Sequence, residues 1–213
     1  MATISNIKAG IRSEVKAALK TLSAEDIETK SNAIVRRLLS LPQFSASRVV
    51  CCYISMPSSE VKTSSIIDTC FNARKRLFVP KVTGKHSVDL RMFEVESEAQ
   101  LSSFPKSSWG IPEPPLDVVI SSPDGTELGV IDLVIVPGVA FDAKCNRLGH
   151  GKGYYDCFLE RLTTKNLKVA APAPTFVGLC FDEQVVPDVP HEPHDKKLDC
   201  VITPTVVFFR GDS

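Results

Sequence analysis

The stretch Ile131-Asp-Leu-Val-Ile-Val136-Pro-Gly138 decides the fold class of this sequence. Five of the six residues from Ile131 to Val136 are apolar, a pattern typical of a strand that is buried on both faces of a parallel sheet. The Pro-Gly pair that follows ends the strand at once. This run therefore predicts an α/β protein.

Apolar runs and amphipathic stretches alternate around this strand. Two helices are predicted first, over residues 5–21 with Ser5 as N-cap, and from a capping box at Ser23-Ala-Glu-Asp26 to a stop at Pro42. Further strands are predicted at 49–54, 77–81, 88–95, 175–181 and 198–203, further helices at 63–76 and 151–163, and loop or sheet edge between 102 and 130. We expect a three-layer α/β/α, Rossmann-like single domain over residues 1–213 with a mainly parallel sheet.

The composition excludes several classes of protein. The 213 residues carry 25 Lys and Arg against 25 Asp and Glu, so neither nucleic acid nor a membrane is an expected partner. A hydrophobic fraction of 43% excludes disorder, and seven cysteines without a C-x-x-C pair indicate reduced thiols. No signal peptide or membrane-spanning run is recognisable, so we expect a soluble, cytoplasmic monomer.

Basic residues recur along the first predicted helix, at Lys8, Arg12, Lys16 and Lys20. Such a stripe is usually a solvated helix face. A transit peptide is the other interpretation, and Glu14 together with the amphipathic pattern of this helix weakens it.

A glycine-rich motif, Asn146-Arg-Leu-Gly-His-Gly-Lys-Gly-Tyr-Tyr-Asp156, is the densest candidate site. Glycines at alternate positions allow backbone N–H groups to converge on an anion, and the motif runs into a predicted helix whose N-terminus favours negative charge. Arg147 and Lys152 add two cations, so a phosphate cradle is indicated. The spacing matches neither the Walker A nor the dinucleotide motif, and a tight β-to-α turn without a ligand is the alternative.

Two carboxylates near this motif suit Mg²⁺, because oxygen atoms are its preferred ligands. Asp156 lies in the first turns of the helix, where the helix dipole favours a carboxylate in any case. Asp195 ends the segment Pro190-His-Glu-Pro-His-Asp195. Its histidines, His191 and His194, suggest zinc only weakly, since no matching Cys or His pair is found elsewhere.

Two further residues are candidates for ligand contacts. Glu60 follows the first predicted strand, at the edge where parallel sheets bind ligands. Trp109 lies among prolines and glycine, where an aromatic ring either fills a gap or stacks on a flat ligand. A surface turn and a packing role are the respective alternatives.

Four ordered motifs carry a resemblance to a known family: Trp109-Gly-Ile-Pro-Glu-Pro114, Asp132-Leu-Val-Ile-Val-Pro-Gly-Val-Ala-Phe-Asp142, Arg147-Leu-Gly-His-Gly-Lys-Gly-Tyr-Tyr-Asp156 and His194-Asp195. Together they resemble the 5-formyltetrahydrofolate cyclo-ligase family, also called methenyltetrahydrofolate synthetase, from about Ile7 to Thr203. The resemblance implies an ATP- and Mg²⁺-dependent conversion of 5-formyltetrahydrofolate to 5,10-methenyltetrahydrofolate. A small-molecule kinase that uses the same anion loop, or a folate-binding paralogue without turnover, are the alternatives.

The resemblance also implies roles for individual residues. ATP contacts are implied for Lys8, Arg12, Arg147, Leu148, Gly149, His150, Gly151, Lys152, Gly153, Tyr154 and Tyr155. Folate contacts are implied for Ile54, Glu60, Trp109, His150, Gly151, Lys152, Gly153 and Tyr154. Asp156 and Asp195 look like metal ligands, and Lys8, Arg147 and Lys152 like the catalytic cations. His150 stands where many relatives carry arginine, and the segment 55–60 is one residue longer than in some of them.

Overall fold

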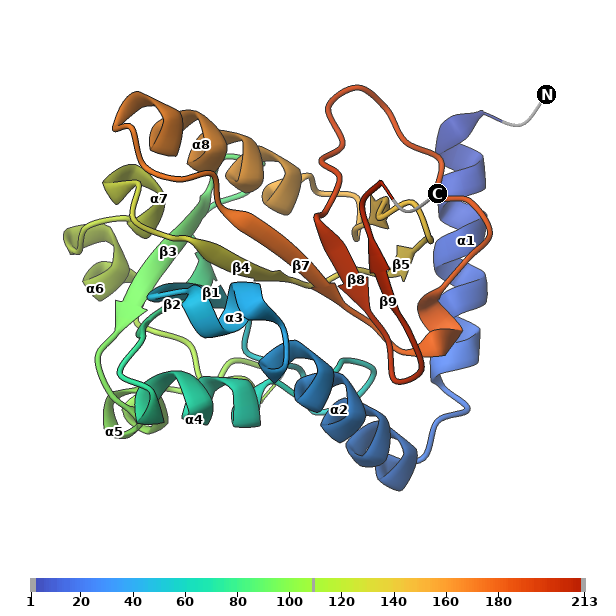
Figure 1. Cartoon of the computed structure of the whole chain (residues 1–213), viewed down its shortest axis with the longest axis horizontal. Coiled ribbons are helices and arrows are strands. Elements are labelled where there is room, and N and C mark those ends of the chain that lie inside the picture. The colour runs from blue at the N-terminus through green and yellow to red at the C-terminus, as the bar shows by residue number, and fades with distance from the viewer. Residues whose placement is uncertain (1–2, 109, 212–213) are drawn as a thin grey trace.

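The computed structural model describes residues 3–108 and 110–211, and it has a seven-stranded sheet at its centre (Figure 1). The strand order is β3-β2-β1-β4-β7-β8-β9, with bounds β1 Val49–Cys52, β2 Arg76–Val82, β3 Leu90–Val95, β4 Leu133–Val136, β7 Thr175–Leu179, β8 Cys200–Ile202 and β9 Val207–Phe209. Strands β2, β1, β4, β7 and β8 run parallel, whereas the edge strands β3 and β9 are antiparallel to their neighbours. The predicted mainly parallel sheet is confirmed.

Helices cover both faces of this sheet, as the three-layer expectation requires (Figure 1). Alternate residues of β4 separate into two cores: Leu133 and Ile135 pack with the helices of one face, and Val134 and Val136 with those of the other. The first face carries α2 (Ala24–Leu39), α3 (Pro42–Ala46), α4 (Ser64–Asn72) and α5 (Glu98–Ser103), and the second carries α7 (Gly125–Leu128) and α8 (Tyr154–Lys168). Helix α6 (Leu116–Ser121) lies beside α7, but its buried Val119 belongs to the core of the first face. No described helix is long and apolar enough to cross a membrane.

Helix α1 (Ile4–Leu19) stands at one end of the sheet (Figure 1). It contacts β5 (Ala140–Phe141), which pairs with β6 (Arg147–Leu148) in a separate two-stranded ribbon, and the short 3₁₀ helix η1 (Asp182–Gln184). Only Val15 and Leu19 of this helix are fully buried. Apolar packing therefore fixes its C-terminal half, and its N-terminal half is available for polar contacts.

The predicted helix starts were partly right. The capping box is present, because the Ser23 hydroxyl accepts from the Asp26 N–H (3.0 Å) and the Asp26 carboxylate accepts from the Ser23 N–H (2.9 Å). The N-cap of α1 is Thr3, whose hydroxyl accepts from the Asn6 N–H, so the prediction of Ser5 was wrong.

Two predicted helix boundaries were wrong because the backbone there is left-handed. Helix α8 begins at Tyr154 and not at Gly151, since Gly151 and Gly153 have φ of +93° and +70°. Helix α4 ends at Asn72 because Arg74 has φ of +55°. The region 102–130, predicted as loop or sheet edge, contains the short helices α6 and α7, and β9 was not predicted.

Asp142, in the turn between β5 and β6, links this ribbon to the chain segment that follows η1. Its carboxylate is fully buried and accepts four hydrogen bonds, from the N–H groups of Lys144 (2.9 Å), Asn146 (2.9 Å) and Val189 (3.0 Å) and from the Asn146 side chain (2.8 Å). Residues 146–149 and 189–195 are therefore held in a fixed relation to each other.

Replacing Asp142 should destabilise the fold, because the buried N–H groups would lose their acceptor. We expect Asp142→Ala to lower the free energy of unfolding by about 3 kcal/mol, measured by urea denaturation. Asp68→Ala, at an exposed position of α4, serves as the control and should change it by less than about 0.5 kcal/mol. An Asp142→Ala variant as stable as the control would contradict this role.

Candidate functional site

A cavity of about 570 Å³ opens beyond the carboxyl ends of β1, β2 and β4, the edge where parallel sheets bind ligands. Glu60 follows β1, Val82 ends β2 and Pro137 follows β4, and all three line the cavity. Three further segments complete it: the N-terminal half of α1, residues 147–156, and residues 192–195. Of the predicted site residues that the structure describes, all but Ile54 lie in this lining: Lys8, Arg12, Glu60, Arg147, Leu148, Gly149, His150, Gly151, Lys152, Gly153, Tyr154, Tyr155, Asp156 and Asp195.

The glycine loop, residues 147–153, packs directly against α1. The Arg12 guanidinium donates through Nε to the carbonyl of Gly149 (2.8 Å), and a Cβ atom on Gly151 would lie 3.5 Å from Arg12 Nη2. Gly151 and Gly153 both need their left-handed backbone to turn the loop into α8. The spacing of glycines thus has a conformational reason, and it also leaves Arg12 room beside the loop.

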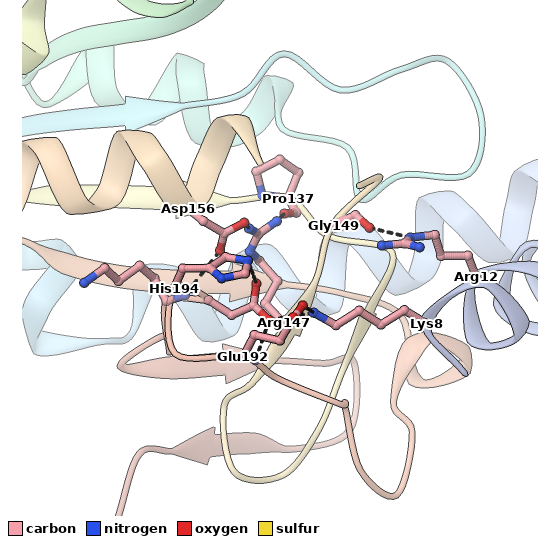
Figure 2. A network of polar contacts seen from close by, with 10 residues as sticks. Lys8, Arg12, Pro137, Arg147, Gly149, Asp156, Glu192 and His194 are labelled. Atoms are coloured by element: carbon pink, nitrogen blue, oxygen red, sulfur yellow. Dashed lines mark hydrogen bonds and ion pairs between the residues drawn. The ribbon is translucent and has the colours of Figure 1, made fainter. Parts of the chain in front are cut away.

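Arg147 and Asp156 form a nearly buried ion pair at one end of the glycine loop (Figure 2). Arg147 Nη2 lies 2.8 Å from Asp156 Oδ2, and the Arg147 side chain is 3% exposed. Its Nη1 donates to the carbonyl of Pro137 (3.3 Å), and its Nε has no hydrogen-bond acceptor among the described residues. Asp156 also accepts from the N–H of Lys196 (3.2 Å), which ties the loop to the residue after Asp195.

Lys8 forms the second ion pair of the cavity, and Figure 2 shows it reaching from α1 toward Glu192. Its Nζ lies 2.7 Å from Asp195 Oδ2 and 3.0 Å from Glu192 Oε2. Burial alone would lower the pKa of Lys8, but its hydrogen bonds to Asp195 and Glu192 raise it. For Asp195, burial works in the raising direction, and the hydrogen bonds from Lys8 and from the N–H of Glu192 outweigh it and lower the pKa.

The acidic end of the cavity has a donor set suited to a divalent cation. Ligand atoms of Glu192, His194 and Asp195 lie within 4.8 Å of one another, and carboxylate oxygens are the ligands that Mg²⁺ prefers. The Lys8 ammonium group already lies between the two carboxylates, and Arg147 pairs with Asp156. The carboxylates of Asp156, Glu192 and Asp195 therefore fit a cation, provided that Lys8 and Arg147 pair with another anion. Since His191 is outside this cluster, the zinc alternative gains no support.

Glu60 lines the cavity from the loop that follows β1. Its carboxylate accepts from the N–H of Met56 (2.8 Å). Burial raises the pKa of Glu60, and the Met56 hydrogen bond acts weakly in the other direction. Ile54 packs against the core and is not in the described lining of the cavity, and Trp109 lies outside the described residues.

The glycine motif contains three side chains that differ in their contacts and surroundings, those of Lys152, Tyr154 and His150. Lys152 is exposed, and no hydrogen bond or ion pair joins its ammonium group to residues 3–108 or 110–211. Tyr154 donates its hydroxyl to the carbonyl of Gly84 (2.9 Å) in the β2–β3 turn. Burial, together with the nearby Arg12 and Arg147, lowers the pKa of His150, so this side chain stays neutral more readily than a free histidine.

Sequence reasoning missed Glu192 as a partner of the site. Its position three residues before Asp195 could have been noticed in the sequence. In the structure the two residues share one turn, in which the N–H of Glu192 donates to the Asp195 carboxylate (2.9 Å). The apolar lining residues Val82 and Leu90 carry no such signal, since nothing distinguishes them from other strand residues.

The fold and the site define a three-layer α/β protein with a charged ligand cavity at the carboxyl ends of its parallel strands. A model of the 5-formyltetrahydrofolate cyclo-ligase family matches residues 4–204. The chain therefore belongs to the 5-formyltetrahydrofolate cyclo-ligase family, and it is an enzyme of the ligase class.

Individual relatives agree with this assignment. A probable 5-formyltetrahydrofolate cyclo-ligase of Schizosaccharomyces pombe is 36% identical over 200 residues, which cover 92% of this chain and 95% of the relative. The 5-formyltetrahydrofolate cyclo-ligase of Mus musculus is 33% identical, covering 94% and 95%. The solved structure of the Aquifex aeolicus 5,10-methenyltetrahydrofolate synthetase has a TM-score of 0.75 at 28% identity, and the match covers 97% of this chain and 94% of that one.

The Lys8–Asp195 pair should leave a pH signature in stability. Because the pKa of Asp195 is below its ordinary value of 3.8 in the folded state, its contribution is present above that value and lost as pH falls further. Because the pKa of Lys8 is above 10.5, its contribution is present below that value and lost at higher pH. The difference in unfolding free energy between wild type and Lys8→Gln should therefore be constant from about pH 5 to pH 9 and shrink below about pH 4.

Urea denaturation across this pH range measures the difference. Lys16→Gln is the control, since Lys16 is exposed on the same helix. A Lys8→Gln difference that does not change between pH 7 and pH 3 would show that the ion pair contributes nothing to folding.

Proposed function

We propose that the protein catalyses the ATP- and Mg²⁺-dependent conversion of 5-formyltetrahydrofolate to 5,10-methenyltetrahydrofolate, with release of ADP and phosphate. The observation that carries the proposal is that one cavity joins a glycine loop, four cations and the two predicted metal-binding carboxylates in a chain of this family. The cations are Lys8, Arg12, Arg147 and Lys152, and the carboxylates are Asp156 and Asp195.

The reaction needs activation of a poor leaving group. Closing the ring from the formamide onto the neighbouring amine nitrogen would require the loss of hydroxide, and transfer of the γ-phosphoryl group of ATP to the formyl oxygen makes phosphate the leaving group. The reacting amine belongs to the substrate, so no nucleophile from the protein is required. What the chain has to provide is positioning of two ligands and neutralisation of phosphate charge.

The cations of the cavity suit this task in two different ways. Lys152 is exposed at the mouth and without a described partner, so it is available for phosphate oxygens at no cost in broken contacts. Lys8 and Arg147 are paired with carboxylates, and an incoming triphosphate offers them replacement anions. Asp195 and Asp156 are then free to hold Mg²⁺, which supplies charge stabilisation on the phosphates.

The folate end of the proposed site is built around Glu60. A buried carboxyl with a raised pKa can accept from, or share a proton with, the N–H groups of the flat pterin ring. Tyr154, at the boundary of the glycine loop, offers an aromatic face between the two ends. The assignments of Ile54 and Trp109 to the folate pocket stay predictions, as do the single domain over residues 1–213, the monomeric state and the cytoplasmic location.

One assay separates this function from the two alternatives. Purified protein is mixed with 5-formyltetrahydrofolate, MgCl₂ and ATP, and the absorbance of the methenyl product is followed. We expect an increase that requires ATP. ADP release without methenyl product would favour a kinase, and folate binding without any turnover would favour a non-catalytic paralogue.

Lys152→Ala should reduce kcat by about 100-fold, since a phosphate-facing cation would be lost from the transition state. Its free energy of unfolding should change by less than about 0.5 kcal/mol, because the side chain is exposed. Lys168→Ala, at an exposed position in the last turn of helix α8, which follows the loop, is the control and should keep wild-type kcat. Near-normal kcat/KM in Lys152→Ala would remove this residue from the mechanism.

A further inference from the structure

Residues 105–108 and 110–113 form the described part of a small hairpin whose role is not explained by the glycine loop. Its backbone is closed by hydrogen bonds from the N–H of Ser107 to the carbonyl of Ile111 and from the N–H of Glu113 to the carbonyl of Pro105, both 2.9 Å long. A bridge between Lys106 and Pro112 adds to this closure. The hairpin keeps its shape through its own backbone, so its position depends on what holds it from outside.

An ion pair attaches the hairpin to the sheet. Lys81 of β2 binds the carboxylate of Glu113, and their side chains are only 17% and 36% exposed. Lys81 lies opposite Arg91 of β3 in the antiparallel register, so the two basic side chains share one face of the sheet. Arg91 donates to the carbonyls of Ile120 (3.2 Å) and Ser122 (3.0 Å). Lys81 and Arg91 thus attach the chain segment between β3 and β4 to the sheet at two points.

The hairpin lies beside the loop that carries Glu60. Gly110 has a left-handed backbone (φ +75°), and a Cβ atom placed on it would lie 3.6 Å from Pro57 Cγ. Pro57 follows Met56, whose N–H is the hydrogen-bond donor to the Glu60 carboxylate. The Lys81–Glu113 ion pair therefore holds a hairpin whose backbone at Gly110 lies next to the Glu60 loop, residues 55–60.

This loop needs external support. Its ends are joined by Ser55 and Thr63, which exchange two hydrogen bonds between backbone N–H and side-chain hydroxyl groups (3.1 and 3.3 Å). Between these ends Pro57 and Ser58 are exposed, and Ser59 has an unfavourable φ of +69° for a residue with a side chain. A hairpin held in place beside Pro57 therefore limits how far Met56 and Glu60 can move.

We propose that the Lys81–Glu113 ion pair is a positioning element for the folate end of the cavity: it holds the hairpin 105–113 against Pro57, which fixes the Glu60 carboxylate in the direction of the substrate. The proposal rests on the proposed function, because it assigns the folate substrate to Glu60. Neither Lys81 nor Glu113 lines the described cavity, so both act through the loop and not by contact with the substrate.

Steady-state kinetics of nearly isosteric variants test the proposal. Glu113→Gln and Lys81→Met should each raise the KM for 5-formyltetrahydrofolate about fivefold, while kcat and the KM for ATP change by less than about twofold. The double variant Lys81→Met/Glu113→Gln should be no worse than either single variant, because both remove one interaction. The exchanged pair Lys81→Glu/Glu113→Lys should recover most of the lost affinity.

Glu94→Gln is the matched control. Glu94 of β3 pairs with Arg76 of β2, with 2.6 Å between Glu94 Oε1 and Arg76 Nε. Arg76 is on the same strand as Lys81 but at its other end. The side chains of Glu94 and Arg76 are 35% and 45% exposed. The KM of the Glu94→Gln variant for 5-formyltetrahydrofolate should equal that of wild type. Equal KM values in Glu113→Gln and Glu94→Gln, in an active wild-type background, would overturn the positioning role and leave the proposed function intact.

Two measurements without turnover complete the test. Calorimetric titration with 5-formyltetrahydrofolate should show the same fivefold loss in Glu113→Gln, even if the wild type binds the folate without converting it. Trp109, the only tryptophan of the sequence, stands between Ser108 and Gly110, so acrylamide quenching of its fluorescence should change in Glu113→Gln and not in Glu94→Gln. A wild-type protein that neither binds nor converts the folate would overturn the proposed function and this proposal together.

Discussion

The charged side chains that close the cavity neutralise one another, and the arrangement of the site depends on this constraint. Lys8 of α1 meets Asp195, 187 residues later in the chain, and Arg147 meets Asp156. A buried charge without a partner costs several kcal/mol, so each pair fixes the approach of the segments that carry it. For α1, with only Val15 and Leu19 fully buried, the polar contacts of Lys8 and Arg12 determine where its N-terminal half lies.

The sheet could be predicted because its signals are local. The apolar run before Pro137 is buried on both faces, and alternate residues such as Leu133 and Val134 enter different cores. Elements without a local signal were missed. Strand β9 has three residues and exists because Val207 pairs with Ile202, while α6 and α7 are too short for helical periodicity to appear in sequence.

The lining of the cavity was predictable as a list of residues and not as a set of contacts. Glycine spacing and clustered charges identify Arg147, Lys152 and Asp156 from a single stretch of sequence. The pairing of Lys8 with Asp195 and the bond from Arg12 to Gly149 join positions 187 and 137 residues apart, and only the folded chain brings them together. Groups that the sequence suggests as ligands for ATP or Mg²⁺ are first of all partners of each other.

In the proposed function, mutual pairing of this kind would favour a ligand with both signs of charge. An anion alone would draw Lys8 away and leave Asp195 and Glu192 facing each other without a cation, and a divalent cation alone would displace the Lys8 ammonium with no anion to receive it. A phosphate chain that arrives with its Mg²⁺ replaces both partners at once. In the proposed reaction this balance favours the metal–nucleotide complex over either component, without any contact to the base or the ribose.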